Sequence, residues 1–330
     1  MLASTLRRTA AAVAAALTLA APLQAEQLNL TLAGASPGGL WTLLGAGLEA
    51  ALSADSPGSS VTYQTSGGGF ANALIVSEGR AEMGLIHDAE LKIALAGGAP
   101  FRGPVKNLRT IGYLYDWAPM QFIASNSWAE KNGVRSLADI AANKVGTKIT
   151  INRAGNITGQ VAAAMLEAAG AGAEQLEGWG GAIITAGSKE QADMLTNGRV
   201  DVYANGVFVR HSSIRKVEEA LDMRLLNVPD DVLDTVGKEF SIAKFTIPAG
   251  TYENQPEPVT TLALGAVLTV SDEMSEEAAY TLTKAMIENI DKIQSVHPAM
   301  KALSHQLMVR ETAAPHHPGA IRAYKEAGLL

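Results

Sequence analysis

The sequence contains no cysteine among its 330 residues. This absence excludes thiol catalysis, cysteine-ligated zinc, disulfide bonds and lipid attachment to an N-terminal cysteine. A chain of roughly 300 residues buries about three quarters of its unfolded surface, so a stable core is expected without disulfide bonds. At about 150 residues per domain, this length predicts two domains.

Clusters of basic residues and long hydrophobic runs are missing as well. Lys and Arg number 26 against 33 Asp and Glu, which gives a net charge of -7. An acidic chain without a basic cluster is poorly suited to nucleic acid or to an anionic membrane surface, and we expect neither as a partner. Beyond the N-terminal region, no apolar run approaches the roughly 18 residues of a membrane-spanning helix, so we expect a mature chain that spans no membrane.

The N-terminal region has the parts of a secretory signal peptide. Arg7 and Arg8 are followed by the apolar stretch 10–21 and by Ala25 at a candidate cleavage site. A segment of this kind is too short to remain as a membrane helix and is removed during export. We therefore predict that residues 1–25 are a signal peptide and that the mature protein is periplasmic.

An internal repeat indicates two similar lobes. Residues 72–86 and 191–205 each contain an amphipathic helix, a Gly-Arg pair, an acidic residue and a short apolar strand. Leu-Glu-Ala-Ala occurs at 48–51 and again at 166–169, at nearly the same offset. Two α/β lobes have a cleft between them, and small ligands bind in clefts of this kind. Capture of a small-molecule ligand is therefore the first functional hypothesis.

Strand-like and helix-like segments alternate along the first lobe. Strands are expected at 28–33, 61–64 and 83–86, with helices between them. Alternation with short loops predicts an α/β protein with a parallel sheet and helices on both faces.

The chain is expected to cross twice between the lobes. Strand-like segments on either side of residues 116–119 form the first crossing, and the segment 242–247 returns the chain. The predicted boundaries are 26–117 plus 246–330 for the first, discontinuous lobe and 118–245 for the second. Two connecting strands form a hinge that can close on a ligand.

Three loops rich in glycine and small residues follow predicted strands and precede helices, at 34–39, 65–69 and 152–156. Open α/β sheets bind ligands at the carboxyl ends of their strands. Helix N-termini at these ends present free N–H groups to anionic or polar groups. The glycines at 67–69 lack the lysine of a phosphate-binding loop and the spacing of a dinucleotide fingerprint, so no nucleotide cofactor is expected.

Two patterns that suggest catalysis or metal binding are weak. Residues 34–38 match Gly-x-Ser-x-Gly, with Ser36 in the place of a serine hydrolase nucleophile. The oxyanion hole needs a backbone N–H from the next residue, and Pro37 has none, so a hydrolase is a remote alternative. His297 and the pair His316–His317 lie near prolines with no carboxylate at ligand spacing, so no metal site is expected.

The predicted ligand contacts come from the glycine-rich loops and from strand ends. Asp88 would accept a hydrogen bond from an ammonium or hydroxyl group, although a hydrated strand end explains His87 and Asp88 equally well. Arg153 would bind a carboxylate with its planar guanidinium, although exposed arginines are common in loops. Trp41 and Phe208 would shape the pocket or simply pack. The predicted set is Ser36, Gly38, Gly39, Trp41, Thr65, Ser66, Gly67, Gly68, His87, Asp88, Arg153, Gly155, Asn156, Thr158, Tyr203 and Asn205.

Several motifs resemble those of one receptor family. Residues 35–41, Ala-Ser-Pro-Gly-Gly-Leu-Trp, resemble its Gly-Ser-Thr-Gly-Gly-Val-Tyr loop, and Ser-Leu-Ala-Asp-Ile at 136–140 resembles its Ser-Leu-Ala-Asp-Leu. The most specific match is Ile-Pro-Ala-Gly-Thr-Tyr at 247–252, and the segments 317–320 and 324–328 resemble the family's closing motifs. Over nearly the whole mature sequence, the chain resembles the TAXI-type solute receptors of TRAP transporters.

The resemblance implies a two-lobed periplasmic-binding-protein fold, type II-like, with two hinge strands and a central cleft. Such a receptor closes around a small organic acid or amino acid, glutamate-like or a dicarboxylate, and delivers it to TRAP membrane permease subunits. An ion gradient drives those subunits, so the resemblance implies neither catalysis nor a cofactor, and we expect a monomer. The same fold could instead serve a periplasmic sensor that feeds a two-component kinase, and the neighbouring genes would distinguish the two.

The sequence departs from the family at the pocket. Pro37 stands where the family usually has threonine, Trp41 replaces a tyrosine, and residues 154–158 differ from the family's Pro-Gly-Ser-Gly-Thr. His87 and Asp88 replace a glutamine and a small polar residue. A carboxylate at Asp88 would repel a simple dicarboxylate and would favour a ligand that carries an amine.

Overall fold

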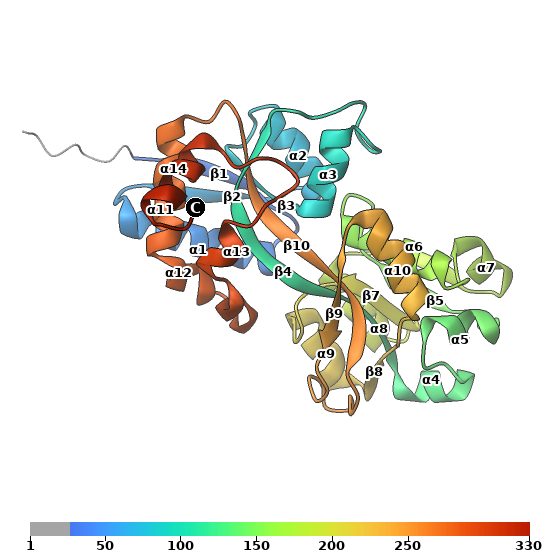
Figure 1. Cartoon of the computed structure of the whole chain (residues 1–330). Helices are drawn as coiled ribbons and strands as arrows, with labels where there is room; N and C mark the ends of the chain where they lie inside the picture. Colours follow the sequence, from blue (N-terminus) through green and yellow to red (C-terminus); the bar gives the residue numbers. More distant parts are fainter. Residues whose placement is uncertain (1–26) are drawn as a thin grey trace, which may run out of the picture.

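Two α/β lobes, joined by two long strands, make up the protein (Figure 1). The structure is a computed structural model that describes residues 27–330, and the predicted signal peptide, residues 1–25, lies outside the described residues. The predicted α/β fold with two lobes and two connecting strands is confirmed. None of the helices in residues 27–330 combines the length and the hydrophobicity needed to span a bilayer.

The elements divide between the lobes in three blocks of sequence. The first lobe contains β1 (Asn29–Ala33), α1 (Leu40–Asp55), β2 (Ser60–Gln64), α2 (Gly69–Ser77), β3 (Met83–His87), α3 (Asp88–Ala96), α11 (Glu276–Glu288), α12 (Ile290–Gln294), the 3-10 helix η1 (Pro298–Ala302), α13 (His305–Met308) and α14 (Pro318–Glu326). The second lobe contains α4 (Asn126–Asn132), α5 (Leu137–Ala142), β5 (Lys148–Ile151), α6 (Ile157–Ala168), α7 (Ala173–Gly178), β6 (Ala182–Thr185), α8 (Ser188–Thr196), β7 (Val202–Gly206), α9 (Ser212–Ala220), β8 (Met223–Leu225), α10 (Asp230–Phe240) and β9 (Ala243–Ile247). The connecting strands are β4 (Leu108–Ser125) and β10 (Val259–Ser271).

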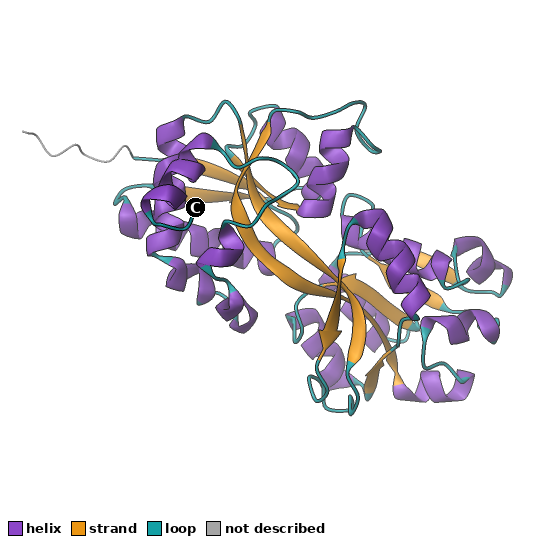
Figure 2. Ribbon diagram, viewed as in Figure 1, coloured by secondary structure: helices purple, strands orange, loops and turns teal. Residues whose placement is uncertain are grey.

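One mixed sheet runs through both lobes in the order β2-β1-β3-β10-β4-β7-β5-β6, with β8 paired to β4 and β9 to β10. In the first lobe β1 is parallel to β2 and β3, while β10 is antiparallel to β3. In the second lobe β5 is parallel to β6 and β7, while β7 is antiparallel to β4. Figure 2 shows helices on both sides of the sheet in each lobe. The predicted parallel core of each lobe is therefore bordered by the antiparallel connecting strands.

Strand β4 changes partners half-way along its length. It pairs with β10 up to Pro119 and with β7 from Met120 onward. Proline has no N–H to give to a ladder, so it is tolerated where one partner strand replaces another. In β10, the register shifts on both sides of Ala266, and a side chain at Gly265 would lie 3.0 Å from the Tyr115 carbonyl oxygen. The second crossing between the lobes therefore lies at a register irregularity of β10 that includes Gly265.

The return crossing lies further along the chain than residue 246, the boundary predicted from the sequence. Strand β9 pairs with the first residues of β10 in the second lobe. Ile247, Tyr252 and Val259 are buried in one cluster with Ile123 and Tyr203 of that lobe. We therefore propose that the second lobe extends from residue 118 to the irregular step of β10 near residue 265.

Candidate ligand-binding cavity

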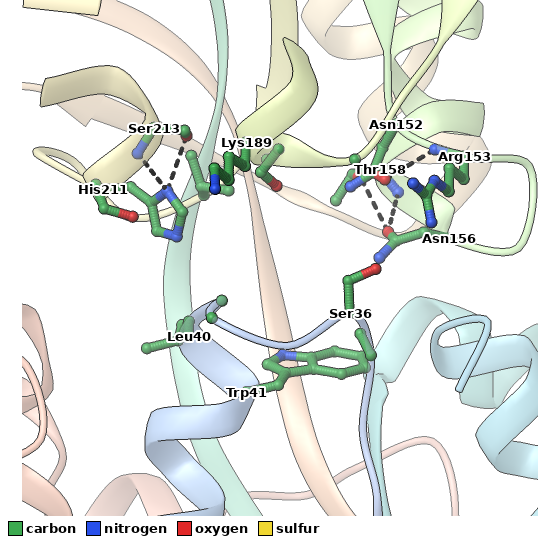
Figure 3. A pocket seen from close by; sticks show the side chains of 18 of the residues that line it. Ser36, Leu40, Trp41, Asn152, Arg153, Asn156, Thr158, Lys189, His211 and Ser213 are labelled. Atoms are coloured by element: carbon green, nitrogen blue, oxygen red, sulfur yellow. Dashed lines mark hydrogen bonds between the residues drawn. The ribbon is translucent and has the colours of Figure 1, made fainter. Parts of the chain in front are cut away.

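A cavity of about 550 Å³ lies between the two lobes. Its walls are the loops that follow β1 and β2 in the first lobe and β5, β6 and β7 in the second. His87 at the end of β3 and two residues of β4, Tyr115 and Ala118, complete the lining. Each of the three predicted glycine-rich loops contributes residues to the lining. Figure 3 shows Ser36, Leu40 and Trp41 on one wall, facing Lys189, His211 and Arg153 on the other. The cavity therefore lies where strand ends of both lobes meet.

Several helices begin at the walls of this cavity. The N-caps of α1 and α8, Gly39 and Gly187, have no side-chain cap among the described residues. His211 is the N-cap of α9, and its Nδ1 accepts the Ser213 N–H at 3.3 Å. Asn156 caps α6 by accepting the Thr158 N–H at 2.9 Å. The first turns of α1 and α8 therefore offer backbone N–H groups and the positive ends of helix dipoles to an anion.

The carboxylate, lysine and arginine side chains of the lining all belong to the second lobe. Arg153 lies 3.6 Å from Glu190, and Lys216 forms an ion pair with Asp193. Within residues 27–330, Lys189 has no acidic partner at ion-pair distance. Lys189 is the second residue of α8, whose N-cap Gly187 has no side chain to cap the helix. An anion placed there would meet both the Lys189 ammonium and the helix N-terminus.

The opposite wall is apolar and aromatic. The Trp41 indole N–H donates to the Tyr115 hydroxyl at 3.0 Å, and the Tyr115 ring meets Phe208 of the second lobe edge-on, with ring centroids 4.8 Å apart. Burial raises the pKa of Tyr115 well above its usual value, so its phenol is neutral. The Trp41 ring also lies 5.1 Å from the His87 ring. The rings of this wall offer flat carbon surface to a ligand.

His211 at the rim of the second lobe is uncharged at neutral pH. Burial, with a smaller effect of His297, lowers its pKa to about 4. Because Nδ1 accepts the Ser213 N–H, the proton of the neutral ring is on Nε2. His211 can therefore act toward a ligand as a neutral hydrogen-bond donor.

Comparison with known proteins agrees with this architecture. The sequence profile of the NMT1-like family matches residues 32–328. The chain belongs to the NMT1-like family. Among solved structures, MatC from Rhodopseudomonas palustris with bound malate has 14% identity over 91% of this chain and 96% of that chain, with a TM-score of 0.54. The periplasmic binding protein BugD has 13% identity over 92% of this chain and 94% of that chain, with a TM-score of 0.53. At these identities the likeness shows the fold, which is that of two-lobed periplasmic binding proteins.

In this NMT1-like chain, ten of the predicted site residues line the cavity. They are Ser36, Gly38, Gly39, Trp41, Ser66, Gly67, His87, Arg153, Asn156 and Thr158. The sequence did not decide whether Phe208 shapes the pocket or packs in the core, and in the structure Phe208 also lines the cavity.

Asp88 is not among the lining residues, so its predicted role as an amine acceptor in the cavity is wrong. It is the first residue of α3, and its carboxylate accepts the Ala313 N–H at 2.8 Å. It therefore fastens the C-terminal segment to the first lobe.

Five further predicted residues lie behind or beside the cavity wall. The Tyr203 hydroxyl is buried against Ser213 Oγ at 3.0 Å, and Asn205 donates to Ser188 Oγ at 2.9 Å. Thr65 precedes the lining residues of its loop without joining them. Gly68 and Gly155 lie against the opposite lobe, so they contribute to the contact between lobes rather than to the lining.

The loop that follows β6 is part of the cavity wall but was not predicted from the sequence. Gly187, Ser188, Lys189 and Glu190 line the cavity at the start of α8. The internal repeat contained the signal, because an offset of 119 positions (191 minus 72) aligns the glycine-rich loop 65–69 with residues 184–188. Tyr115, His211 and Lys216 were missed because no local motif marks them. Asn152 begins the predicted loop 152–156 but was not named as a ligand contact.

Proposed function

We propose that this protein is an extracytoplasmic solute receptor that captures a small organic acid or amino acid between its lobes. The observation that carries the proposal is the division of the cavity into a charged wall and an aromatic wall. A ligand carboxylate would lie near Lys189, Arg153 and the start of α8, while its carbon skeleton would cover Trp41 and Tyr115. Such a ligand touches both lobes, so it stabilises the closed form over the open one.

We further propose that the receptor delivers its ligand to a TRAP-type permease, as TAXI receptors do. The motif at 247–252 and the closing segments at 317–320 and 324–328 support this assignment. The malate in the structure of MatC supports an organic acid as the ligand class. Neighbouring genes that encode TRAP membrane subunits are expected. A sensor kinase gene in their place would favour a signalling receptor.

Thermal melting of residues 26–330 against a panel of acids tests the binding function. The panel contains glutamate, malate, succinate, 2-oxoglutarate and phenylacetate, each with a control in which every carboxylate is converted to an amide or ester. A ligand at about a thousand times its Kd adds about 4 kcal/mol to the free energy of unfolding, and each kcal/mol raises Tm by roughly 2–4 °C. We expect one acid to raise Tm while its amide or ester control does not. If no acid changes Tm, the proposed function is wrong for this ligand class.

A further inference from the structure

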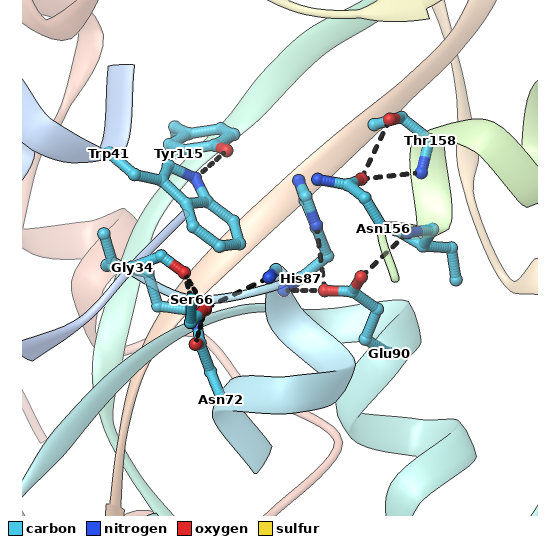
Figure 4. A network of polar contacts seen from close by, with 12 residues as sticks. Gly34, Trp41, Ser66, Asn72, His87, Glu90, Tyr115, Asn156 and Thr158 are labelled. Atoms are coloured by element: carbon cyan, nitrogen blue, oxygen red, sulfur yellow. Dashed lines mark hydrogen bonds and ion pairs between the residues drawn. The ribbon is translucent and has the colours of Figure 1, made fainter. Parts of the chain in front are cut away.

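The two lobes touch at a buried carboxylate that lies beside the cavity. Glu90 of α3 is fully buried, with 0% of its surface exposed, and it is not a lining residue. Figure 4 shows it between His87 of its own lobe and the start of α6 in the other lobe. Its two carboxylate oxygens therefore face different lobes.

Each oxygen of Glu90 has its own donors. Oε2 accepts the His87 N–H at 3.0 Å and lies 3.0 Å from His87 Nδ1, both within the first lobe. Oε1 accepts the N–H of Ile157, the first residue of α6 in the second lobe, at 2.8 Å. Gly69, the first residue of α2, is so close that a methyl group there would lie 1.6 Å from Oε2. The carboxylate thus lies where three helices begin, at their positive ends.

The surrounding surfaces fit one another across the lobe boundary. A methyl group on Gly68 would lie 2.7 Å from the Gly155 carbonyl oxygen, so only glycine allows these loops to approach. Further out, Lys92 of α3 donates to Ser241 at the end of α10. A buried carboxylate is stable only when it is hydrogen-bonded. An opening that separates these loops would break the Ile157 bond and expose Glu90 to water, so we expect this contact in the closed form alone.

We propose that Glu90 is a positioning residue that latches the lobes together when the cleft closes. It acts through the start of α6, which carries Asn156 and Thr158 of the cavity wall, and it does not touch the ligand. Only the effect of the latch on ligand affinity, which is tighter binding of an acid, rests on the proposed function. The contact between the lobes can be tested without any ligand.

The distance between the lobes is the measurement that tests this latch. Because the sequence has no cysteine, spin labels at Ala96→Cys on α3 and Lys238→Cys on α10 report only that distance. Both positions are exposed, and they lie on the helices that Lys92 and Ser241 connect. Pulsed electron paramagnetic resonance is recorded without added solute and with each acid of the panel. We expect the wild-type protein to show a short distance between the labels. In Glu90→Gln this distance should be less frequent, because an amide has one acceptor oxygen and leaves the N–H of His87 or of Ile157 without a partner.

Two further variants separate the latch from a general loss of stability. Ile157→Pro removes the donor from the other side, at a first helical position where proline is tolerated, and Ile157→Ala shortens the side chain while keeping the N–H. Asp139→Asn is the matched control, since Asp139 accepts the Arg135 and Ser136 N–H groups at 2.8 Å inside the second lobe. Glu90→Gln and Ile157→Pro should lower the fraction of molecules that show the short distance. They should also raise the Kd of a bound acid about tenfold. Ile157→Ala and Asp139→Asn should leave the distance unchanged.

The outcomes are distinguishable. If Glu90→Gln keeps the wild-type distance distribution, or if Asp139→Asn alters it equally, the latch is overturned. The same holds if the wild-type protein shows no short distance in any condition. If Glu90→Gln and Ile157→Pro make the short distance less frequent while no acid changes Tm, the closure contact stands and the proposed function fails.

Discussion

A methyl group on Gly155 of the second lobe would lie 2.6 Å from the carbonyl oxygen of Gly67 in the first lobe. The three atoms nearest to that methyl group all belong to Gly67, so alanine meets no obstacle within its own lobe. We expect Gly155→Ala to hinder closure while the stability of each lobe changes little. An overpacked contact costs about 1–3 kcal/mol, so the Kd of a bound acid should rise roughly tenfold, as measured by isothermal titration calorimetry.

The control for this prediction is Gly178→Ala at the end of α7, where nothing lies within 4 Å of the added methyl group. It should leave the Kd unchanged. Equal Kd values for Gly155→Ala and the wild-type protein would show that the closed contact between these loops does not form in solution.

Lys189 is expected to contribute directly to acid binding. It lines the cavity, follows the uncapped start of α8 and has no acidic partner among residues 27–330. A hydrogen bond to a charged group contributes about 1.5–3 kcal/mol, so Lys189→Ala should raise the Kd by about tenfold or more. Lys238→Ala, at an exposed position of α10, should not. High salt should weaken binding to the wild-type protein more than binding to Lys189→Ala, and equal salt dependence would contradict the proposed ion pair.

Asp88 is expected to affect stability and not affinity. Its carboxylate holds the Ala313 N–H at 2.8 Å, outside the cavity lining. Asp88→Asn keeps an acceptor oxygen but loses its charge, so the free energy of unfolding should fall by about 1 kcal/mol while the Kd stays the same. Urea unfolding and calorimetric titration check the two parts separately. A weaker affinity for amino acids alone would restore Asp88 as an amine acceptor.

The sequence predicted what depends on local pattern. Loops 34–39, 65–69 and 152–156 were found because a strand, a glycine-rich turn and a helix leave a recognisable order of residues. The interruption expected at 116–119 is absent, because β4 passes through Pro119 by exchanging one partner strand for another. Whether a proline breaks a strand depends on the neighbours of that strand, which a single sequence does not contain.

The parts of the site that the sequence missed depend on contacts between distant residues. Glu90 is one acidic residue on a short helix, and its partner Ile157 is 67 positions away in the other lobe. Asp88 follows a strand end, as a ligand contact would, but the C-terminal segment returns to cover it at Ala313. In both cases the local sequence indicates a polar residue near the cleft, and tertiary packing decides what that residue contacts.

His211 should make the protein less stable in acid. Its pKa is about 4 in the folded protein and about 6.5 in an unfolded chain. Between these values the unfolded state binds a proton that the folded state does not, so stability falls as the pH decreases from 6.5 toward 4. A difference of this size corresponds to roughly 3 kcal/mol at the acid end of the range.

The variant that isolates this effect is His211→Asn. Asparagine can replace the cap that His211 gives to the Ser213 N–H, because Asn is among the preferred N-cap residues, and it does not titrate. His297, whose pKa burial also lowers, remains in both proteins. The free energy of unfolding in urea, measured at pH 7.5 and pH 4.5, should therefore fall less in His211→Asn than in the wild-type protein. An equal fall in both proteins would mean that His211 takes up its proton without unfolding, and that the start of α9 carries a positive charge toward the cavity in acid.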